Sequence, residues 1–303
     1  MTPRSRALWQ IHFCVVLWGF TAILGKLIEL PALPLVSWRM LIVSALLLCV
    51  PHVWRGLRAM PARRIGLYLA IGVVVALHWL GFYASIKLAN ASVAATCMAV
   101  GPVFLAVIEP VVMRRRFDVR ELLFGLAIVP GVVLVLGGVP GGMVVGFGVG
   151  VISAAFVALF GALNKRHAHH ADPLCVTCLE MGGGAIVMCL TSLFWPHTGG
   201  FLPIPGGHDA LLLLILAVGC TLLPFALSLV ALRELTAFSV QLAVNLEPVY
   251  AVILAILLLG EQKELGAAFY GGVAIIVAAV LLHPLLVPER AVPADPPAGP
   301  LID

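Results

Sequence analysis

Long apolar stretches follow one another through the whole chain and leave little that could fold in water. Each is about as long as the ~20 residues that an α-helix needs to cross the hydrocarbon core of a bilayer. Only 11% of the 303 residues are charged, too few to cover a water-soluble surface. The sequence therefore predicts an all-α polytopic membrane protein with ten transmembrane helices. The ten segments are 7–28, 33–54, 65–86, 92–113, 121–139, 144–164, 174–195, 210–231, 236–259 and 266–287.

Several other classes of protein are excluded by the residue pattern. Strands of a membrane β-barrel alternate apolar and polar side chains, whereas a run such as 252–259 is apolar throughout. The formal net charge is only +4, and the basic residues lie between apolar segments, so neither a nucleic-acid-binding protein nor a soluble secreted protein is expected. All seven cysteines fall within apolar segments, which is typical of helix packing rather than of a disulfide framework.

The basic residues are distributed unequally over the two sides of the predicted bundle. With the N-terminus in the cytoplasm, 14 Lys and Arg lie on that side and 4 on the other. Cytoplasmic loops carry such an excess of positive charge. No small-residue cleavage site follows the basic start, 1–6, so the first helix is expected to stay uncleaved. We expect a protein of the cell inner (plasma) membrane with both termini cytoplasmic and a disordered Pro/Ala-rich tail over 288–303.

The two halves of the chain are similar to each other. Gly101-Pro102-Val103-Phe104 corresponds to Glu247-Pro248-Val249-Tyr250 at an offset of 146 residues. Earlier in each half, Gly25-Lys26 corresponds to Asn164-Lys165 at an offset of 139 residues. Because each half holds an odd number of predicted helices, the second half enters the membrane upside down. The prediction is two inverted five-helix repeats, 1–139 and 140–287, with a central site at their interface.

Glu247 is the strongest candidate for a functional side chain. It lies about 11 residues into its segment, or roughly 16 Å, close to the bilayer midplane. An ionisable group at this depth is costly and is a functional candidate by default. Pro248 cannot donate the next backbone hydrogen bond, so a kink facing a cavity is expected there, and another at Pro102. Asn245 joins Glu247 as a candidate; the alternative for Glu247 is structural pairing with a neighbouring helix.

Other polar and aromatic residues at membrane depth complete the candidate site. Trp18 lies too deep for an interfacial belt, whereas a belt at the outer leaflet is the alternative for Trp79 and Tyr83, which share a helix face. A structural ion pair with a basic loop cluster is the alternative for Glu109 and for Glu180. Gly182-Gly183-Gly184 follows Glu180 and lets another helix approach closely. The candidates for substrate binding or coupling are Glu247, Asn245, His78, Trp79, Trp18, Asn164, Glu180, Tyr83 and Glu109.

Three cations lie near the outer ends of predicted helices. Lys26, Arg39 and Lys87 are expected to extend their charged groups to the interface, and the alternative is an outer gate in which one of them pairs with Glu29.

No pattern in the sequence predicts a metal site, a cofactor or an enzyme. Cys175 and Cys178 have CxxC spacing but lie in an apolar run with no second pair. HExxH and GxSxG motifs are absent, and so is the GxxxxGK[ST] loop that ATP-driven transport by this chain alone would need.

The order of these motifs resembles a known family. Leu17-Trp18-Gly19, Trp38-Arg39, the two Pro-Val-aromatic segments and the run 257–261 are similar to those of the EamA-type branch of the drug/metabolite transporter superfamily. The resemblance implies ten helices in two inverted five-helix repeats, and the movement of small metabolites, often amino acids outward. Two positions depart from the family pattern: Arg114-Arg115-Arg116 stands where a Gly-Glu pair is common, and Phe20 where a polar residue often follows Trp-Gly.

The predicted function is therefore secondary or facilitative transport across the inner membrane, as an exporter of small polar or amphipathic metabolites such as amino acids. The alternatives are a membrane-embedded enzyme and an uptake permease of the same fold. The expected partners are a small-molecule substrate and the lipid bilayer, without nucleic acid or an ATPase subunit, and the protein is expected to be a monomer or a homodimer.

Overall fold

The computed structural model describes residues 2–167, 169–194, 201–244 and 246–286. Within these ranges the chain forms α-helices, short 3₁₀ and π segments and connecting loops, and no β-strand occurs in them. The prediction of an all-α fold is thereby confirmed for the described residues.

Within the described residues, helical structure is present in each of the ten predicted segments, although half of them are interrupted. The uninterrupted helices are α1 (Pro3–Leu27), α4 (Ala62–Leu88), α9 (Val144–His167), α10 (Pro173–Phe194) and α15 (Ala267–Leu286). The interrupted segments are α2 (Ala32–Leu48) with α3 (Pro51–Ala59), α5 (Ala91–Met98) with α6 (Gly101–Met113), α7 (Val119–Leu126) with α8 (Val129–Gly137), α11 (Gly207–Ala217) with the π segment η2 (Val218–Leu222) and α12 (Leu223–Glu234), and α13 (Ala237–Val244) with α14 (Glu247–Leu254) and the π segment η3 (Ala255–Leu259). The 3₁₀ turns η1 (Gly141–Met143) and η4 (Glu261–Lys263) precede α9 and α15.

Six helical stretches of the described chain are long and apolar enough to cross a membrane. The bent pair α2 and α3 is a seventh if it counts as one span. Together with the apolar composition, these stretches define a multi-pass membrane protein. The six are Pro3–Leu27, Ala62–Leu88, Ala91–Met113, Gly141–His167, Pro173–Phe194 and Gly207–Glu234.

The segment predicted as a single helix over 33–54 turns sharply instead. The axes of α2 and α3 differ by 89°. The reason is local: a proline ring disfavours the helical conformation in the residue before it, and Val50, which precedes Pro51, is extended with φ −89° and ψ 117°. Pro51 then starts α3, at a helix position where its missing N–H costs nothing.

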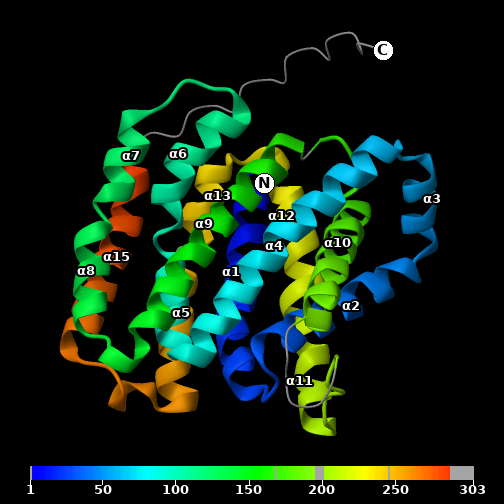
Figure 1. Cartoon of the computed structure of the whole chain (residues 1–303). Coiled ribbons are helices and arrows are strands. Elements are labelled where there is room, and N and C mark those ends of the chain that lie inside the picture. The colour runs from blue at the N-terminus through cyan, green and yellow to red at the C-terminus, as the bar shows by residue number, and fades with distance from the viewer. Residues whose placement is uncertain (1, 168, 195–200, 245, 287–303) are drawn as a thin grey trace.

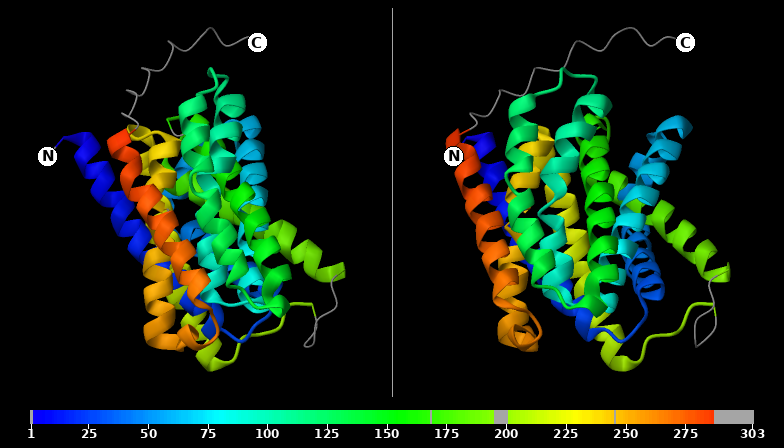
Figure 2. Two further views of the ribbon diagram at one scale, coloured as in Figure 1. Left: turned by 90° about the vertical axis from the view of Figure 1, so that its left-hand side faces the viewer. Right: turned by 60° about the vertical axis from the view of Figure 1, so that its left-hand side comes forward.

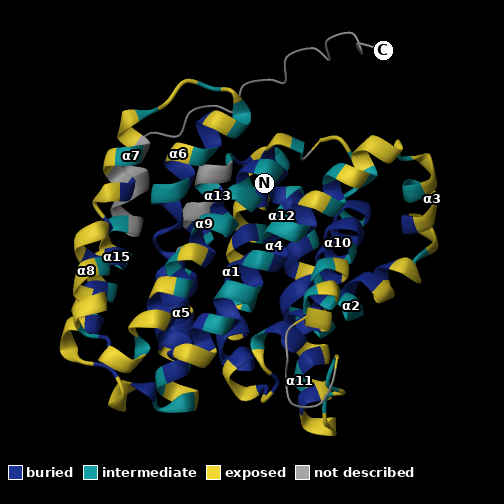
Figure 3. Cartoon of the chain, viewed as in Figure 1, coloured by how far each residue is buried: buried dark blue, intermediate teal, exposed yellow. Residues whose placement is uncertain are grey.

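The helices form one bundle, with α1, α4, α9 and α12 near its middle (Figure 1). On one side lie α7, α8 and α15, and on the other α2, α3, α10 and α11. The start of α1 and the end of α15 lie at the same end of the bundle (Figure 2). Buried residues concentrate in the middle of the bundle, whereas α3 and the outer side of α8 are largely exposed (Figure 3). This arrangement surrounds the central helices with packed neighbours, and it is there that a polar cavity lies.

Glycines allow α4 and α10 to approach each other closely. A Cβ atom at Gly183 would overlap the backbone carbonyl of Leu69, and one at Gly72 would overlap the backbone of Glu180. The close approach predicted from Gly182-Gly183-Gly184 is therefore confirmed at Gly183.

Two residues that correspond at the offset of 146 share an uncommon backbone conformation. Arg114, after α6, has φ 52°, and Gly260, after η3, has φ 70°. This left-handed region is open to glycine and strained for other residues. The chain thus keeps the same turn in both halves although only one half has the glycine.

Replacing Arg114 by glycine is therefore expected to stabilise the protein. The gain is the strain of the left-handed conformation less the greater flexibility of glycine in the unfolded chain, about 0.5–1 kcal/mol in total. Thermal unfolding of purified protein checks the result. Arg116→Gly removes the same charge from the same cluster and is the control; equal melting temperatures for the two variants would contradict the explanation.

The η4 turn caps the N-terminus of α5 with a buried carboxylate. Glu261 accepts hydrogen bonds from the backbone N–H groups of Ala91 (3.1 Å) and Ser92 (3.0 Å) and from the hydroxyl of Ser92 (2.7 Å). Asn90 donates from its side chain to Glu264 at 3.0 Å. These bonds satisfy amide groups that have no partner within the first turn of a helix, and they join segments about 170 residues apart in the sequence.

Candidate functional site

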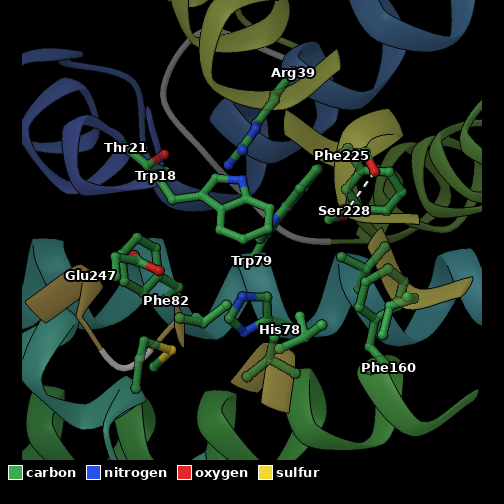
Figure 4. A pocket seen from close by; sticks show the side chains of 17 residues that line it. Trp18, Thr21, Arg39, His78, Trp79, Phe82, Phe160, Phe225, Ser228 and Glu247 are labelled. Atoms are coloured by element: carbon green, nitrogen blue, oxygen red, sulfur yellow. Dashed lines mark hydrogen bonds between the residues drawn. The ribbon is translucent and has the colours of Figure 1, made fainter. Parts of the chain in front are cut away.

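A cavity of about 110 Å³ lies among the central helices of the bundle (Figure 4). Aromatic rings form much of its wall, and five polar side chains, those of Thr21, Arg39, His78, Ser228 and Glu247, also reach it. Side chains from α1, α2, α4, α5, α9, α12, α13 and α14 contribute. The lining residues are Trp18, Thr21, Arg39, Val75, His78, Trp79, Phe82, Met98, Val157, Phe160, Gly161, Phe225, Ser228, Leu232, Val240, Val244 and Glu247.

Arg39 is held firmly at one side of this cavity. Its Nε donates to the hydroxyl of Thr221 at 2.6 Å, Nη1 to the hydroxyl of Tyr83 at 2.7 Å, and Nη2 to the carbonyl of Cys220 at 3.3 Å. Its Cζ atom lies 3.7 Å from the ring centroid of Trp79, a cation–π contact. The side chain is only 1% exposed, so the guanidinium is removed from water and fixed by contacts with α4 and η2.

His78 is fixed by a reciprocal pair of hydrogen bonds with Ser153. The hydroxyl of Ser153 donates to the His78 carbonyl at 2.6 Å, and Nδ1 of His78 lies 2.9 Å from that hydroxyl and 3.1 Å from the Ser153 carbonyl. Because the serine proton is already used, Nδ1 must be the donor in the second contact. In the neutral ring Nε2 is then an acceptor, and His78 lines the cavity.

Glu247 and Thr21 present oxygen atoms to the same space. Glu247 is the first residue of α14 and is 8% exposed. Its carboxylate has no hydrogen-bond or ion-pair partner among the described residues, and it forms no ion pair with Arg39 across the cavity. The hydroxyl of Thr21 is buried and likewise unpaired within the described chain. The cavity thus holds a cation, a carboxylate and three neutral polar groups, among which the described structure has no hydrogen bond or ion pair.

Four of the predicted site residues lie around this cavity: Trp18, His78, Trp79 and Glu247. Tyr83 does not line it, but its hydroxyl accepts a hydrogen bond from Arg39. The alternative of an aromatic belt is wrong for Trp79 and Tyr83, which are 7% and 0% exposed. The extension of Arg39 to the interface is also wrong, because Thr221, Tyr83 and Trp79 offer the guanidinium closer partners than water does.

The remaining acidic and amide candidates lie elsewhere. Glu109 is paired with Arg115 at 3.5 Å, which matches the structural alternative. Glu180 is fully buried on α10, and Asn164 donates to the carbonyl of Phe160 at 3.3 Å; neither lines the cavity. Asn245 lies outside the described residues.

The two prolines predicted to kink helices instead begin new ones. Pro102 lies in the first turn of α6 and Pro248 in the first turn of α14. A proline in the first turn interrupts no hydrogen bond, so the breaks in the chain lie just before the prolines rather than at them. The break before α14 places Glu247 at a helix start beside the cavity.

Arg39 is the charged residue of this site that was expected at the interface instead, and Thr21 and Ser228 were not predicted. The position of Arg39 near a helix end favoured an interfacial role, whereas its partners come from the distant segments η2 and α4. The available signal was the Trp38-Arg39 pair itself, an arginine at the start of an otherwise apolar segment.

The described residues contain no group of three His, Cys, Asp or Glu side chains arranged to hold a metal ion. Cys175 of the CxxC pair is buried, and its thiol lies 3.7 Å from the carbonyl of Val53.

A helical membrane bundle that encloses a polar cavity with aromatic walls is the architecture of a membrane transport protein. The model of the EamA-like transporter family matches residues 6–137 and 144–283, one match in each half. The chain therefore belongs to the EamA-like transporter family, as its motifs predicted.

Comparison with solved structures supports the fold alone. A structure titled "Crystal structure of protein" is similar to 93% of this chain and 97% of its own, with a TM-score of 0.67 and 17% sequence identity. No curated protein matches the chain.

Proposed function

We propose that the protein is a secondary or facilitative transporter of the inner membrane that exports small polar or amphipathic metabolites such as amino acids. The observation that carries this proposal is the central cavity, where Arg39 and Glu247 face one space without forming an ion pair with each other. Opposite charges held apart in a low-dielectric site are complementary to a ligand that carries both charges. The aromatic walls add affinity for an apolar side chain.

The proposal includes ten membrane crossings in two inverted five-helix repeats, 1–139 and 140–287. Supporting it are the helical structure over all ten apolar segments, the family match in each half, and the left-handed residues Arg114 and Gly260 at equivalent positions. In this arrangement the cavity lies between the repeats, and access alternates between the two sides of the membrane. The small molecule and the bilayer are its partners, without an ATPase subunit, and it functions as a monomer or homodimer.

Transport is tested with purified protein in proteoliposomes. Preloaded vesicles are expected to exchange radiolabelled amino acids saturably, and a panel with charged, polar and aromatic side chains identifies the preferred class. Vesicles without protein and vesicles with Glu247→Gln are the controls. Chemical conversion of the solute, instead of its movement, would favour the alternative of a membrane-embedded enzyme, and net accumulation in cells would favour an uptake permease.

The orientation follows from the 14 to 4 distribution of Lys and Arg, which favours cytoplasmic termini. Two reporters fused after Asp303 test this orientation. A reporter that functions only in the cytoplasm is expected to give a signal, and a reporter that functions only outside is expected to give none. The opposite pattern would contradict the ten-crossing topology.

A further inference from the structure

We propose that Arg39 is the receptor for a carboxylate group of the ligand, and that Pro224 is the positioning residue that orients it. The proposal deepens the transport function proposed above and rests on the same cavity. It draws on the hydrogen bonds of the guanidinium, the backbone geometry of η2 and the charges around the cavity.

The guanidinium of Arg39 has donors left over. Arginine carries five N–H groups in a planar fork. Three of them have partners in Thr221, Tyr83 and Cys220, which leaves two without a partner in the described chain. Arg39 lines the cavity, and Figure 4 shows its side chain directed toward Trp18 and Trp79. A charged group with unused donors in a buried position requires an acceptor.

The carbonyl of Cys220, which accepts from Nη2 of Arg39, lacks its usual helical donor because of a proline. In an α-helix the Cys220 carbonyl would accept from the N–H four residues later, and that residue is Pro224, which has none. The backbone widens into the π segment η2 at this point, where the N–H of Leu223 bonds to the carbonyl of Val218. Arg39 from α2 supplies the missing donor to Cys220 at 3.3 Å.

The same π segment orients a second partner. The hydroxyl of Thr221 donates to the carbonyl of Leu216, five residues earlier, at 2.7 Å, and it therefore presents its lone pair to Nε of Arg39. With Tyr83 and the ring of Trp79 on the other side, the plane of the guanidinium is fixed from two directions. Pro224 thus acts on the cavity through Arg39, without a ligand contact of its own being required.

A carboxylate is the group that fits the open side of this arrangement. The remaining donors, one on each Nη atom, belong to a charged group, and charge-assisted bonds from such donors to a carboxylate are about twice as strong as neutral ones. The carboxylate of Glu247 also lines the cavity but forms no ion pair with Arg39, so this place is open to a carboxylate of the ligand. Trp18, Phe160 and Phe225 offer apolar contact to the rest of the molecule.

Benzoate and benzamide are the probes that test the receptor. They have nearly the same shape, and only benzoate carries a carboxylate. Binding to the purified full chain in detergent is followed by tryptophan fluorescence, because Trp18 and Trp79 line the cavity. The wild-type protein is expected to bind benzoate at least tenfold more tightly than benzamide. Equal affinities, or no saturable binding of benzoate, would overturn the proposal.

Two variants and one control separate the receptor from its positioning residue. Arg39→Gln is expected to remove the preference for benzoate. Pro224→Ala restores an N–H that competes for the Cys220 carbonyl, and it is expected to reduce the preference at least threefold while the affinity for benzamide stays unchanged. Pro110→Ala removes a proline from inside α6, away from the cavity, and is expected to keep the wild-type ratio.

If Pro224→Ala keeps the wild-type ratio of benzoate to benzamide affinity, the positioning role of Pro224 is overturned, even if Arg39→Gln does not fold. Binding is measured without any transport step, so a benzoate preference in a protein that moves no solute contradicts the proposed function and leaves the receptor intact. Transport of solutes that lack a carboxylate, together with equal affinities for benzoate and benzamide, would support the proposed function and contradict the receptor role of Arg39.

Discussion

Glu247→Gln is expected to reduce amino-acid flux in proteoliposomes by at least about 30-fold while the protein still folds. Truncating one partner of a buried, hydrogen-bonded charge pair costs about 2–5 kcal/mol, and a substrate amine bound in the cavity would form such a pair with Glu247. Glutamine keeps the shape of the side chain and removes the charge. Because the carboxylate has no partner among the described residues, its loss breaks no internal ion pair.

The measurement compares initial flux per folded molecule with the melting temperature of the same preparation. Glu234→Gln makes the same chemical change at an exposed position outside the cavity and is expected to leave flux unchanged. If Glu247 has only a structural role, Glu247→Gln lowers the melting temperature and leaves flux intact. Full flux in this variant would contradict the functional role.

Gly183→Ala is expected to destabilise the protein by about 3 kcal/mol, at the upper end of the usual range for overpacking. The added methyl group would meet the backbone carbonyl of Leu69, and neither backbone can move without separating α10 from α4. A flexible side chain could rotate away from such a contact, but a carbonyl within a helix cannot.

Gly148→Ala is the matched control, since the Cβ at this position of α9 meets nothing within 4 Å. An alanine there is expected to be neutral or to stabilise the helix slightly. Thermal or denaturant unfolding of both variants in the same detergent provides the comparison. Similar stabilities for the two variants would show that the contact between α4 and α10 yields at little cost.

The course of the helices followed from the sequence because apolar length determines where a chain can cross a membrane. What the sequence did not predict were the breaks within those segments. The bend before Pro51 follows a simple steric rule, yet it was hidden by an apolar run that continues across it. The π segments η2 and η3 depend on contacts with other helices, as the bonds of Arg39 to η2 illustrate, and local sequence holds no such information.

The residues of the candidate site that the sequence predicted are those whose depth in the membrane was enough to place them near the cavity. Glu247, His78 and Trp18 lie in the middle of their segments, so any inward-facing orientation brings them near the bundle centre. Arg39 lies near the end of its segment, where a long side chain can reach either water or a buried partner. Which of the two it reaches depends on the packing of η2 against α2, a contact between segments about 180 residues apart in the chain.

The Glu261 cap also determines how this end of the bundle can move. One buried carboxylate holds both backbone and side-chain donors at the start of α5, and losing some of them would leave charge or amide groups buried without partners. A small displacement therefore costs nearly as much as complete separation, after which water replaces the lost bonds. The contact between η4 and α5 should therefore have two states, formed and broken, without stable intermediates. Any motion that opens this end must break the hydrogen bonds of Glu261 cooperatively.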